Sequence, residues 1–148
     1  MSELRLGPGR EFDRLRGILA RLGNAARDIG DDCALVPDGP GRLVVSVDLA
    51  VEGVHFRRDW LTMEEIGWRA ASAALSDLAA EGAETVSLLA SVAVPPTASD
   101  EDLFALMAGV GAGAVAAGGV VSGGDLSAGD RWVVNVTVIG RARRPVTR

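Results

Sequence analysis

Lysine is missing from the sequence, because all 15 basic residues are arginines. A Walker-type phosphate loop, a Schiff-base lysine and a lysine general base are therefore excluded. One histidine, His55, and one cysteine, Cys33, are too few for a Cys/His zinc site or an intramolecular disulfide. Tyrosine is absent altogether. Cys33 is most simply a small core residue, and its isolation agrees with a reducing, cytoplasmic setting.

Basic charge is scarce as well. The 20 acidic residues outnumber the 15 basic ones, and the net charge of -5 disfavours a broad contact with nucleic acid. Residues 1–12 carry charges and no apolar segment, so no secretory signal is visible. The uncharged run 103–124 has the length of a membrane span, but its glycines favour a packed helix, a turn and a buried strand. We expect no membrane partner.

The length and composition predict one domain with a sizeable core, or one half of a larger enzyme, since 48% of the 148 residues are hydrophobic. Strand-like and helix-like segments alternate, which predicts an α/β domain with helices laid on a sheet. The expected helices are 11–22, 63–80 and 100–117, and the expected strands are 43–47, 86–94, 120–121 and 132–139. Thr62 and Ser99 would cap the second and third helices. Gly109 and Gly111 stand inside a helical pattern, so they are discounted as a dinucleotide-binding motif.

Five carboxylates stand in apolar surroundings: Asp31, Asp32, Asp48, Asp77 and Asp125. Removing an ionised carboxylate from water is costly unless the group is paired, and the arginines cluster elsewhere in the sequence. Hard divalent cations such as Mg²⁺, which take oxygen ligands, are the simplest partners. Each acid also has an ordinary interpretation, as a turn, cap, strand-end or solvated helix residue. A lone histidine is likewise more often structural, and the methionines and the three tryptophans are interpreted as packing residues.

The segments IGDDCALV, SVDLAVEGVHF, LSDLAAEGA, SGGDLS and the terminal VTR follow one another along the chain. In order and spacing they resemble the N-terminal half of thiamine-monophosphate kinase over residues 9–148. The resemblance implies a mixed sheet covered by helices, the N-terminal ATP-binding domain of the aminoimidazole ribonucleotide synthetase-like fold, occupying residues 1–148. The family's second half does not follow Arg148, so this piece is expected to bind Mg-ATP weakly and to be inactive alone.

The same resemblance implies an enzyme that transfers the γ-phosphoryl group of ATP to thiamine monophosphate, with Mg²⁺ as cofactor, in a homodimer. It implies metal ligands at Asp32, with Asp31 beside it, and at Ser46, Val47, Asp48, Asp77 and Asp125. It further implies a substrate contact at His55 and ATP contacts at Gly124, Asp125 and Arg148.

Three positions depart from the family's pattern. Val47 replaces a threonine, so only its backbone carbonyl could ligate a metal. Ala74 stands where asparagine is usual, and Met107 falls near the position of an ATP-side tyrosine. Aminoimidazole ribonucleotide synthetase, selenophosphate synthetase and the hydrogenase-maturation dehydratase share the architecture, but EGVHF and SDLAA favour the thiamine enzyme.

The implied reaction needs no general base, because the second pKa of a phosphate monoester is about 6 and the acceptor oxygen is largely ionised at neutral pH. Catalysis then consists of positioning and of charge neutralisation by metal ions. We expect Asp32, Asp48, Asp77 and Asp125 to converge in one pocket around those ions. The alternatives are a related ATP-dependent synthetase and a noncatalytic dimerisation module whose acids lie in structural turns.

Overall fold

The computed structural model describes residues 9–27, 29, 33, 34 and 36–146. Helices and strands alternate as expected, in the order α1 (Arg10–Leu22), a short 3-10 turn (Gly23–Ala25), β1 (Arg42–Val51), α2 (Met63–Ala80), β2 (Glu84–Val94), α3 (Asp100–Ala116), β3 (Val120–Ala128) and β4 (Val133–Ala142). The predicted α/β class is confirmed. Among the described residues no helix has the length and apolarity to cross a membrane.

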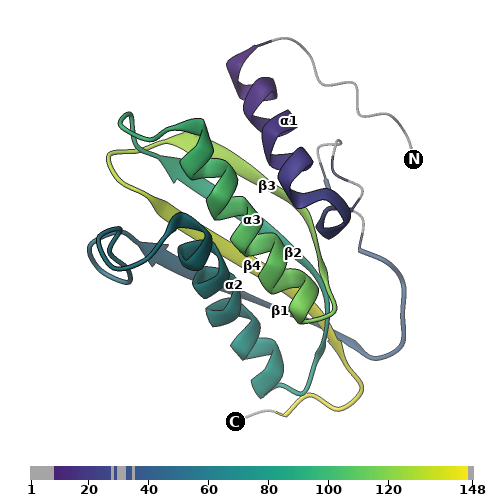
Figure 1. Cartoon of the computed structure of the whole chain (residues 1–148). Helices are drawn as coiled ribbons and strands as arrows, with labels where there is room; N and C mark the ends of the chain where they lie inside the picture. The colour runs from purple at the N-terminus through teal and green to yellow at the C-terminus, as the bar shows by residue number, and fades with distance from the viewer. Residues whose placement is uncertain (1–8, 28, 30–32, 35, 147–148) are drawn as a thin grey trace.

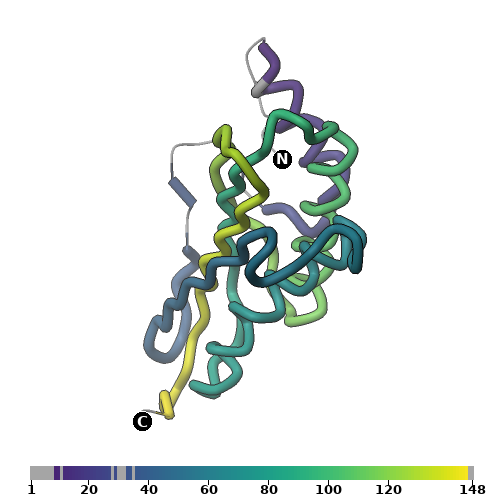
Figure 2. Tube along the Cα trace, turned by 90° about the vertical axis from the view of Figure 1, so that its left-hand side faces the viewer, coloured from purple at the N-terminus to yellow at the C-terminus, as the bar shows by residue number. Residues whose placement is uncertain are grey.

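The four strands form one mixed sheet in the order β1-β4-β2-β3. β4 is antiparallel to both of its neighbours, and β3 runs parallel to β2. Helices α2 and α3 lie side by side on one face of this sheet, and α1 packs beyond α3 (Figure 1). Seen from the side, the strands form one layer and the helices the other (Figure 2). The predicted mixed sheet with a helical cover is confirmed.

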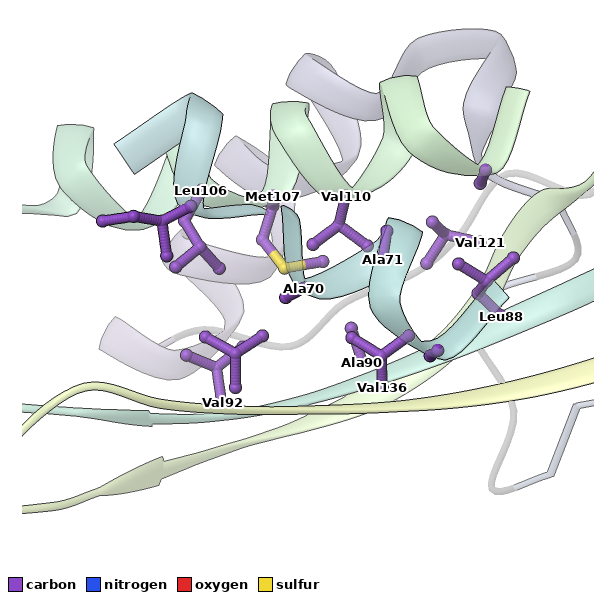
Figure 3. Packing of buried hydrophobic residues seen from close by; sticks show 14 of the residues in the cluster. Ala70, Ala71, Leu88, Ala90, Val92, Leu106, Met107, Val110, Val121 and Val136 are labelled. Atoms are coloured by element: carbon purple, nitrogen blue, oxygen red, sulfur yellow. The ribbon is translucent and has the colours of Figure 1, made fainter. Parts of the chain in front are cut away.

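The core lies between the sheet and these two helices. Ala70 and Ala71 from α2 and Val110 from α3 point toward Ala90 and Val136 on the sheet (Figure 3). In β4 every second residue from Val134 to Val138 is fully buried, because side chains on a strand alternate between its two faces. Small side chains on α2 let the helix approach the sheet closely. The same alternation determines on which face of the sheet each polar side chain of a strand lies.

Glycines set the distance between α2 and α3. A Cβ added at Gly67 would lie 1.9 Å from the Leu106 carbonyl oxygen, and one at Gly109 would lie 1.9 Å from the Glu64 carbonyl oxygen. Each helix therefore places a glycine where the backbone of the other helix passes. Gly109 and Gly111 are packing residues inside α3, which confirms that they are not a nucleotide-binding loop.

Both predicted helix caps are confirmed. Thr62 and Glu65 form a reciprocal capping box at the start of α2, and Ser99 and Asp102 form one at the start of α3. Burial raises the pKa of Asp102, but hydrogen bonds from Ser99 and the charge of Arg58 outweigh this and leave the pKa below its ordinary value. The charged form of Asp102 is therefore part of the cap.

We expect Ser99→Ala to lower the free energy of unfolding by about 1 kcal/mol at neutral pH, because α3 loses a cap hydrogen bond. A carboxyl with a lowered folded pKa stabilises the protein above its unfolded pKa, about 4, and this contribution is lost as the pH falls through the folded value. The loss caused by Ser99→Ala should therefore shrink toward about pH 3. Urea unfolding at pH 7 and at about pH 3 measures the free energy of unfolding of both proteins. An equal loss at the two pH values would contradict a contribution from the charge of Asp102.

Four details of the sequence interpretation are wrong. Asp48 lies inside β1, because its pairing with β4 continues to Val51. Asp125 lies inside β3, whose pairing with β2 runs past the glycines to Ala128. Cys33 is exposed, not a core residue. Of the tryptophans only Trp132 is buried; Trp60 and Trp68, the latter outside the buried stripe of α2, are exposed.

Candidate functional site

Two carboxylates and a hydroxyl gather between β1 and α2. Asp48 and Ser46 are two positions apart on β1 and pair with Val136 and Val138, which are buried under the helices. Their side chains therefore share the helix-covered face and are spaced by about 7 Å along the strand. The Ser46 hydroxyl donates to Oδ2 of Asp77 on α2, at 2.5 Å. This bond ties the edge strand to the helix, and Asp48 lies two residues further along the same face of β1.

His55 is held beside this group by a turn that follows β1. The Gly53 N–H donates to the Phe56 carbonyl at 2.8 Å, and the His55 N–H donates to the Val51 carbonyl at 2.8 Å. The Val51 N–H in turn donates to Nδ1 of the His55 ring at 3.0 Å. Because Nδ1 accepts this bond, the ring proton of neutral His55 stands on Nε2. The exposed ring thus presents a hydrogen-bond donor to the solvent.

A cavity of about 560 Å³ opens between β1, the turn and α2, here named the β1–α2 cavity. Its lining combines the predicted residues Asp48 and His55 with two residues of α2, Trp68 and Arg69. The remaining lining residues are mostly small: Leu49, Ala50, Ala70, Ser72 and Ala73. A cavity of this volume has the size of a small-molecule site.

Asp125 does not join this group. In β3 it pairs with Ser91, whereas its neighbour Gly124 pairs with Ala90, which is buried under the helices. Alternation therefore places the Asp125 side chain on the opposite face of the sheet from Asp48. The two acids are separated by three strand spacings, or about 14 Å. The expected single pocket for Asp48 and Asp125 is wrong within one chain.

Gly124 is required by the sheet itself. Its φ is 157°, and a Cβ at this position would lie 1.9 Å from the Ala90 carbonyl oxygen. Asp125 lines a second cavity of about 820 Å³, together with Gly124, α1 and the residues Ile29, Cys33 and Ala34. The site therefore has two separate parts, one at the β1 edge of the sheet and one at the β3 edge.

Three predicted residues, Asp31, Asp32 and Arg148, lie outside the described residues. The departures from the family's pattern can be located. Val47 points its side chain away from Asp48 and is exposed on the other face of β1. Ala74 is fully buried and Met107 nearly so, and Met107 lines the second cavity. Apolar packing thus replaces polar groups at the positions of Ala74 and Met107.

No described part of the chain brings together three His, Cys, Asp or Glu side chains that could hold a metal ion. The group at β1 and α2 supplies two carboxylates and one hydroxyl. Such a set suits Mg²⁺, which keeps several waters and is completed by the phosphates of a substrate, better than a cation that needs a full protein cage.

Sequence reasoning missed two residues of the β1–α2 cavity. From the sequence, Trp68 is interpreted as a packing residue, and there is no signal for Arg69. The buried positions of α2 are Met63, Ile66, Gly67, Ala70, Ala71, Ala74 and Leu78. They recur with the period of a helix, and Trp68 falls outside their stripe. That offset was the signal in the sequence that the tryptophan faces outward.

Comparisons with known proteins agree with the fold. Residues 30–142 match the family model described as AIR synthase related protein, N-terminal domain. The chain is 39% identical over 121 residues to the thiamine-monophosphate kinase of Mycobacterium tuberculosis, covering 80% of this chain and 36% of that protein. It is 33% identical to the solved thiamine-monophosphate kinase of Stenotrophomonas maltophilia K279a, with a TM-score of 0.70, covering 93% of this chain and 43% of that one.

A third similar structure is the Aquifex aeolicus enzyme complexed with AMPPCP and TMP. It has a TM-score of 0.69 and 28% identity, and the match covers 96% of this chain and 46% of that chain. The chain therefore spans less than half the length of the relatives that it matches.

Proposed function

The chain belongs to the family of AIR synthase related proteins, in which it corresponds to the N-terminal domain, and we propose that it is the nucleotide- and Mg²⁺-binding part of a thiamine-monophosphate kinase. The observation that supports this most directly is the β1–α2 cavity, where Asp48 and His55 meet beside the Ser46–Asp77 pair. The reaction is the transfer of the γ-phosphoryl group of ATP to thiamine monophosphate. The identity to thiamine-monophosphate kinases supports these substrates.

The residues at β1 and α2 fit Mg²⁺ by their chemistry, because all of their ligating atoms are oxygens. Asp48 and Asp77 would hold the ion directly. Ser46 fixes the orientation of Asp77 through its hydrogen bond, and Val47 could contribute only its backbone carbonyl. When bound, Mg²⁺ neutralises the charge of the phosphates that must approach one another.

The chain's own side chains divide the remaining work. The Nε2–H of His55 is a donor for an oxygen of the acceptor phosphate, fixed in direction by the bond from Val51 to Nδ1. Gly124 and Asp125 are proposed to contact ATP in the second cavity, with Arg148, Asp32 and Asp31 as further ligands. Because Asp125 lies about 14 Å from Asp48 within one chain, the ATP of one protomer would have to reach the β1–α2 cavity of its dimer partner. No residue needs to remove a proton, because the acceptor oxygen is already ionised at neutral pH. The protein positions two anions and offsets their repulsion.

A reconstituted enzyme tests the proposal. In a chimera, this chain is followed by the C-terminal part of the Mycobacterium tuberculosis relative, and the formation of thiamine diphosphate from thiamine monophosphate is measured with ATP and Mg²⁺. We expect Mg²⁺-dependent turnover by the chimera and none by residues 1–148 alone. A folded chimera that binds the nucleotide but leaves thiamine monophosphate unchanged, or that uses another acceptor, would refute the thiamine assignment.

A homodimer is part of the same proposal. The outer face of β1 carries Leu43, Val45, Val47 and Leu49, each at least half exposed. Among the described strands β1 is also an edge strand, since it pairs with β4 alone. An edge strand with a continuous apolar face is a surface that proteins cover. We propose that a second copy of the chain covers it.

We expect the double substitution of Val45 and Val47 by Glu to convert this dimer to a monomer, because two charges would be buried without partners. Both side chains are 57% exposed in the single chain, so the monomer should tolerate the change. Val54→Glu is the matched control, since Val54 is 70% exposed but lies in the turn after β1. Sedimentation equilibrium measures the mass. A monomeric parent protein, or a dimeric double variant, would contradict the proposed interface.

A further inference from the structure

The β1–α2 cavity contains two side chains to which the proposed function assigns no role. Trp68 on α2 lines this cavity and is 45% exposed. Arg69, the next residue, lines the same cavity and makes no ion pair or side-chain hydrogen bond with any described residue. A half-exposed indole and an unpaired guanidinium in the lining of a cavity can both bind a ligand, because the described part of the protein supplies neither with a partner.

We infer that Trp68 and Arg69 are the acceptor-recognition residues of this cavity. Trp68 provides a flat face for the cationic ring of the acceptor, and Arg69 binds its phosphate. The inference rests on the proposed function, because it takes thiamine monophosphate as the acceptor. It adds to that function the residues that would distinguish this substrate from other phosphate monoesters.

The chemistry of the two residues matches the two ends of the acceptor. Thiamine carries a positively charged thiazolium ring, and a cation over the face of an indole is attracted by the ring's quadrupole. A guanidinium forms paired, charge-assisted hydrogen bonds with phosphate oxygens. The phosphate end must lie toward Asp48, because the transfer requires the acceptor oxygen near the metal held there. His55, on the same lining, is then available to contact that phosphate as well.

Trp60, the other exposed tryptophan, is not available to bind a cationic ligand as Trp68 is. Trp60 is 73% exposed, but the guanidinium of Arg57 already lies 4.7 Å from the centroid of its ring. Arg57 is in turn paired with Asp59. The Trp60 ring therefore has a cation from the protein itself, and it does not line the β1–α2 cavity. Among the described residues Trp68 has no such ring partner.

Isothermal titration calorimetry on residues 1–148 tests both residues with two probes, thiamine monophosphate and unphosphorylated thiamine. We expect Trp68→Ala to weaken the binding of both probes by about tenfold, and Trp68→Phe to retain most of it, since a smaller aromatic face remains. Arg69→Ala should weaken thiamine monophosphate by about tenfold and leave thiamine unchanged. Trp60→Ala and Arg144→Ala, which alter exposed residues outside the cavity, should bind both probes as the parent does.

Three results overturn the inference. The first is that Trp68→Ala and Arg69→Ala bind both probes with the affinity of the parent. The second is that the two control variants lose as much affinity as Trp68→Ala and Arg69→Ala do. The third is that the parent chain does not bind thiamine monophosphate. Turnover by the chimera distinguishes a failure of the recognition role of Trp68 and Arg69 from a failure of the proposed function. A chimera that phosphorylates thiamine monophosphate with the same KM in the Trp68→Ala and Arg69→Ala variants keeps the function and removes the recognition role. A chimera without turnover removes the function itself.

Discussion

Gly109→Ala should destabilise this domain more than the same change at either of the other glycines of α3, Gly111 and Gly113. The new Cβ would lie 1.9 Å from the Glu64 carbonyl oxygen and 2.8 Å from the Trp68 backbone nitrogen. Backbone atoms cannot rotate out of the way as a side chain can, so α2 and α3 must separate. We expect a loss of about 3 kcal/mol in the free energy of unfolding, at the upper end of overpacking effects, and a fall in Tm of roughly 6–12 °C.

Gly111→Ala is the matched control, since it makes the same change two residues later in the same helix. Its Cβ would meet Leu22 Cδ2 at 2.5 Å, which is the far end of a flexible side chain. The strain should be smaller, and alanine's higher helix propensity offsets part of it by about 1 kcal/mol. Thermal and urea unfolding of the two variants measure the difference. Equal losses would show that the close approach of the two helix backbones does not limit stability.

The same contact explains what the sequence could and could not predict about the helices. The limits of α2 and α3 were predictable to within one residue, because Thr62 and Ser99 begin them with capping boxes that are purely local. The reason for Gly109 was not predictable. A glycine is needed at this position because the Glu64 carbonyl of another helix lies beside it. No local sequence pattern indicates which backbone will pass beside a given residue.

The strands were predicted too short for a related reason. The interpretation placed Asp48 at the end of the first strand and Asp125 beyond the strand at 120–121, because acids and glycines are disfavoured in isolated strands. Pairing decides otherwise, since β4 continues the ladder to Val51 and β2 continues it through Gly124 to Ala128. The extension has a functional consequence. A residue inside a strand belongs to one face, so Asp48 and Asp125 are directed to opposite faces.

The candidate site was therefore predictable in its members more than in its arrangement. The order of the motifs indicated Asp48, Asp77 and His55. The structure places Asp48 and His55 in the lining of the β1–α2 cavity and joins Asp77 to Ser46, two residues before Asp48. The sequence could not show that the sheet separates Asp125 from them. It also could not reveal the apolar outer face of β1 as exposed, because alternating valines and leucines in a strand ordinarily indicate a buried face.

The largest functional effect is expected from Asp48→Asn. The substitution keeps the shape of the side chain and removes the charge that would hold Mg²⁺ at the β1–α2 cavity. In the chimera we expect kcat/KM for thiamine monophosphate to fall by about 100-fold, because the transfer loses most of its charge neutralisation. Steady-state assays over a range of Mg²⁺ concentrations measure it. A higher Mg²⁺ concentration should restore part of the lost rate, since the remaining oxygen ligands still bind the ion weakly.

Two variants show whether the effect belongs to that position. Asp130→Asn removes an equal charge from the exposed connection between β3 and β4 and should leave kcat/KM unchanged. Asp125→Asn acts on the other face of the sheet, so it should raise the KM for ATP without changing the Mg²⁺ concentration that restores Asp48→Asn. If Asp48→Asn and Asp125→Asn instead shift the Mg²⁺ requirement equally, both acids contact the same ion. That result would require a second protomer to bring the partner's acid across the sheet edge, because within one chain the two side chains point to opposite faces.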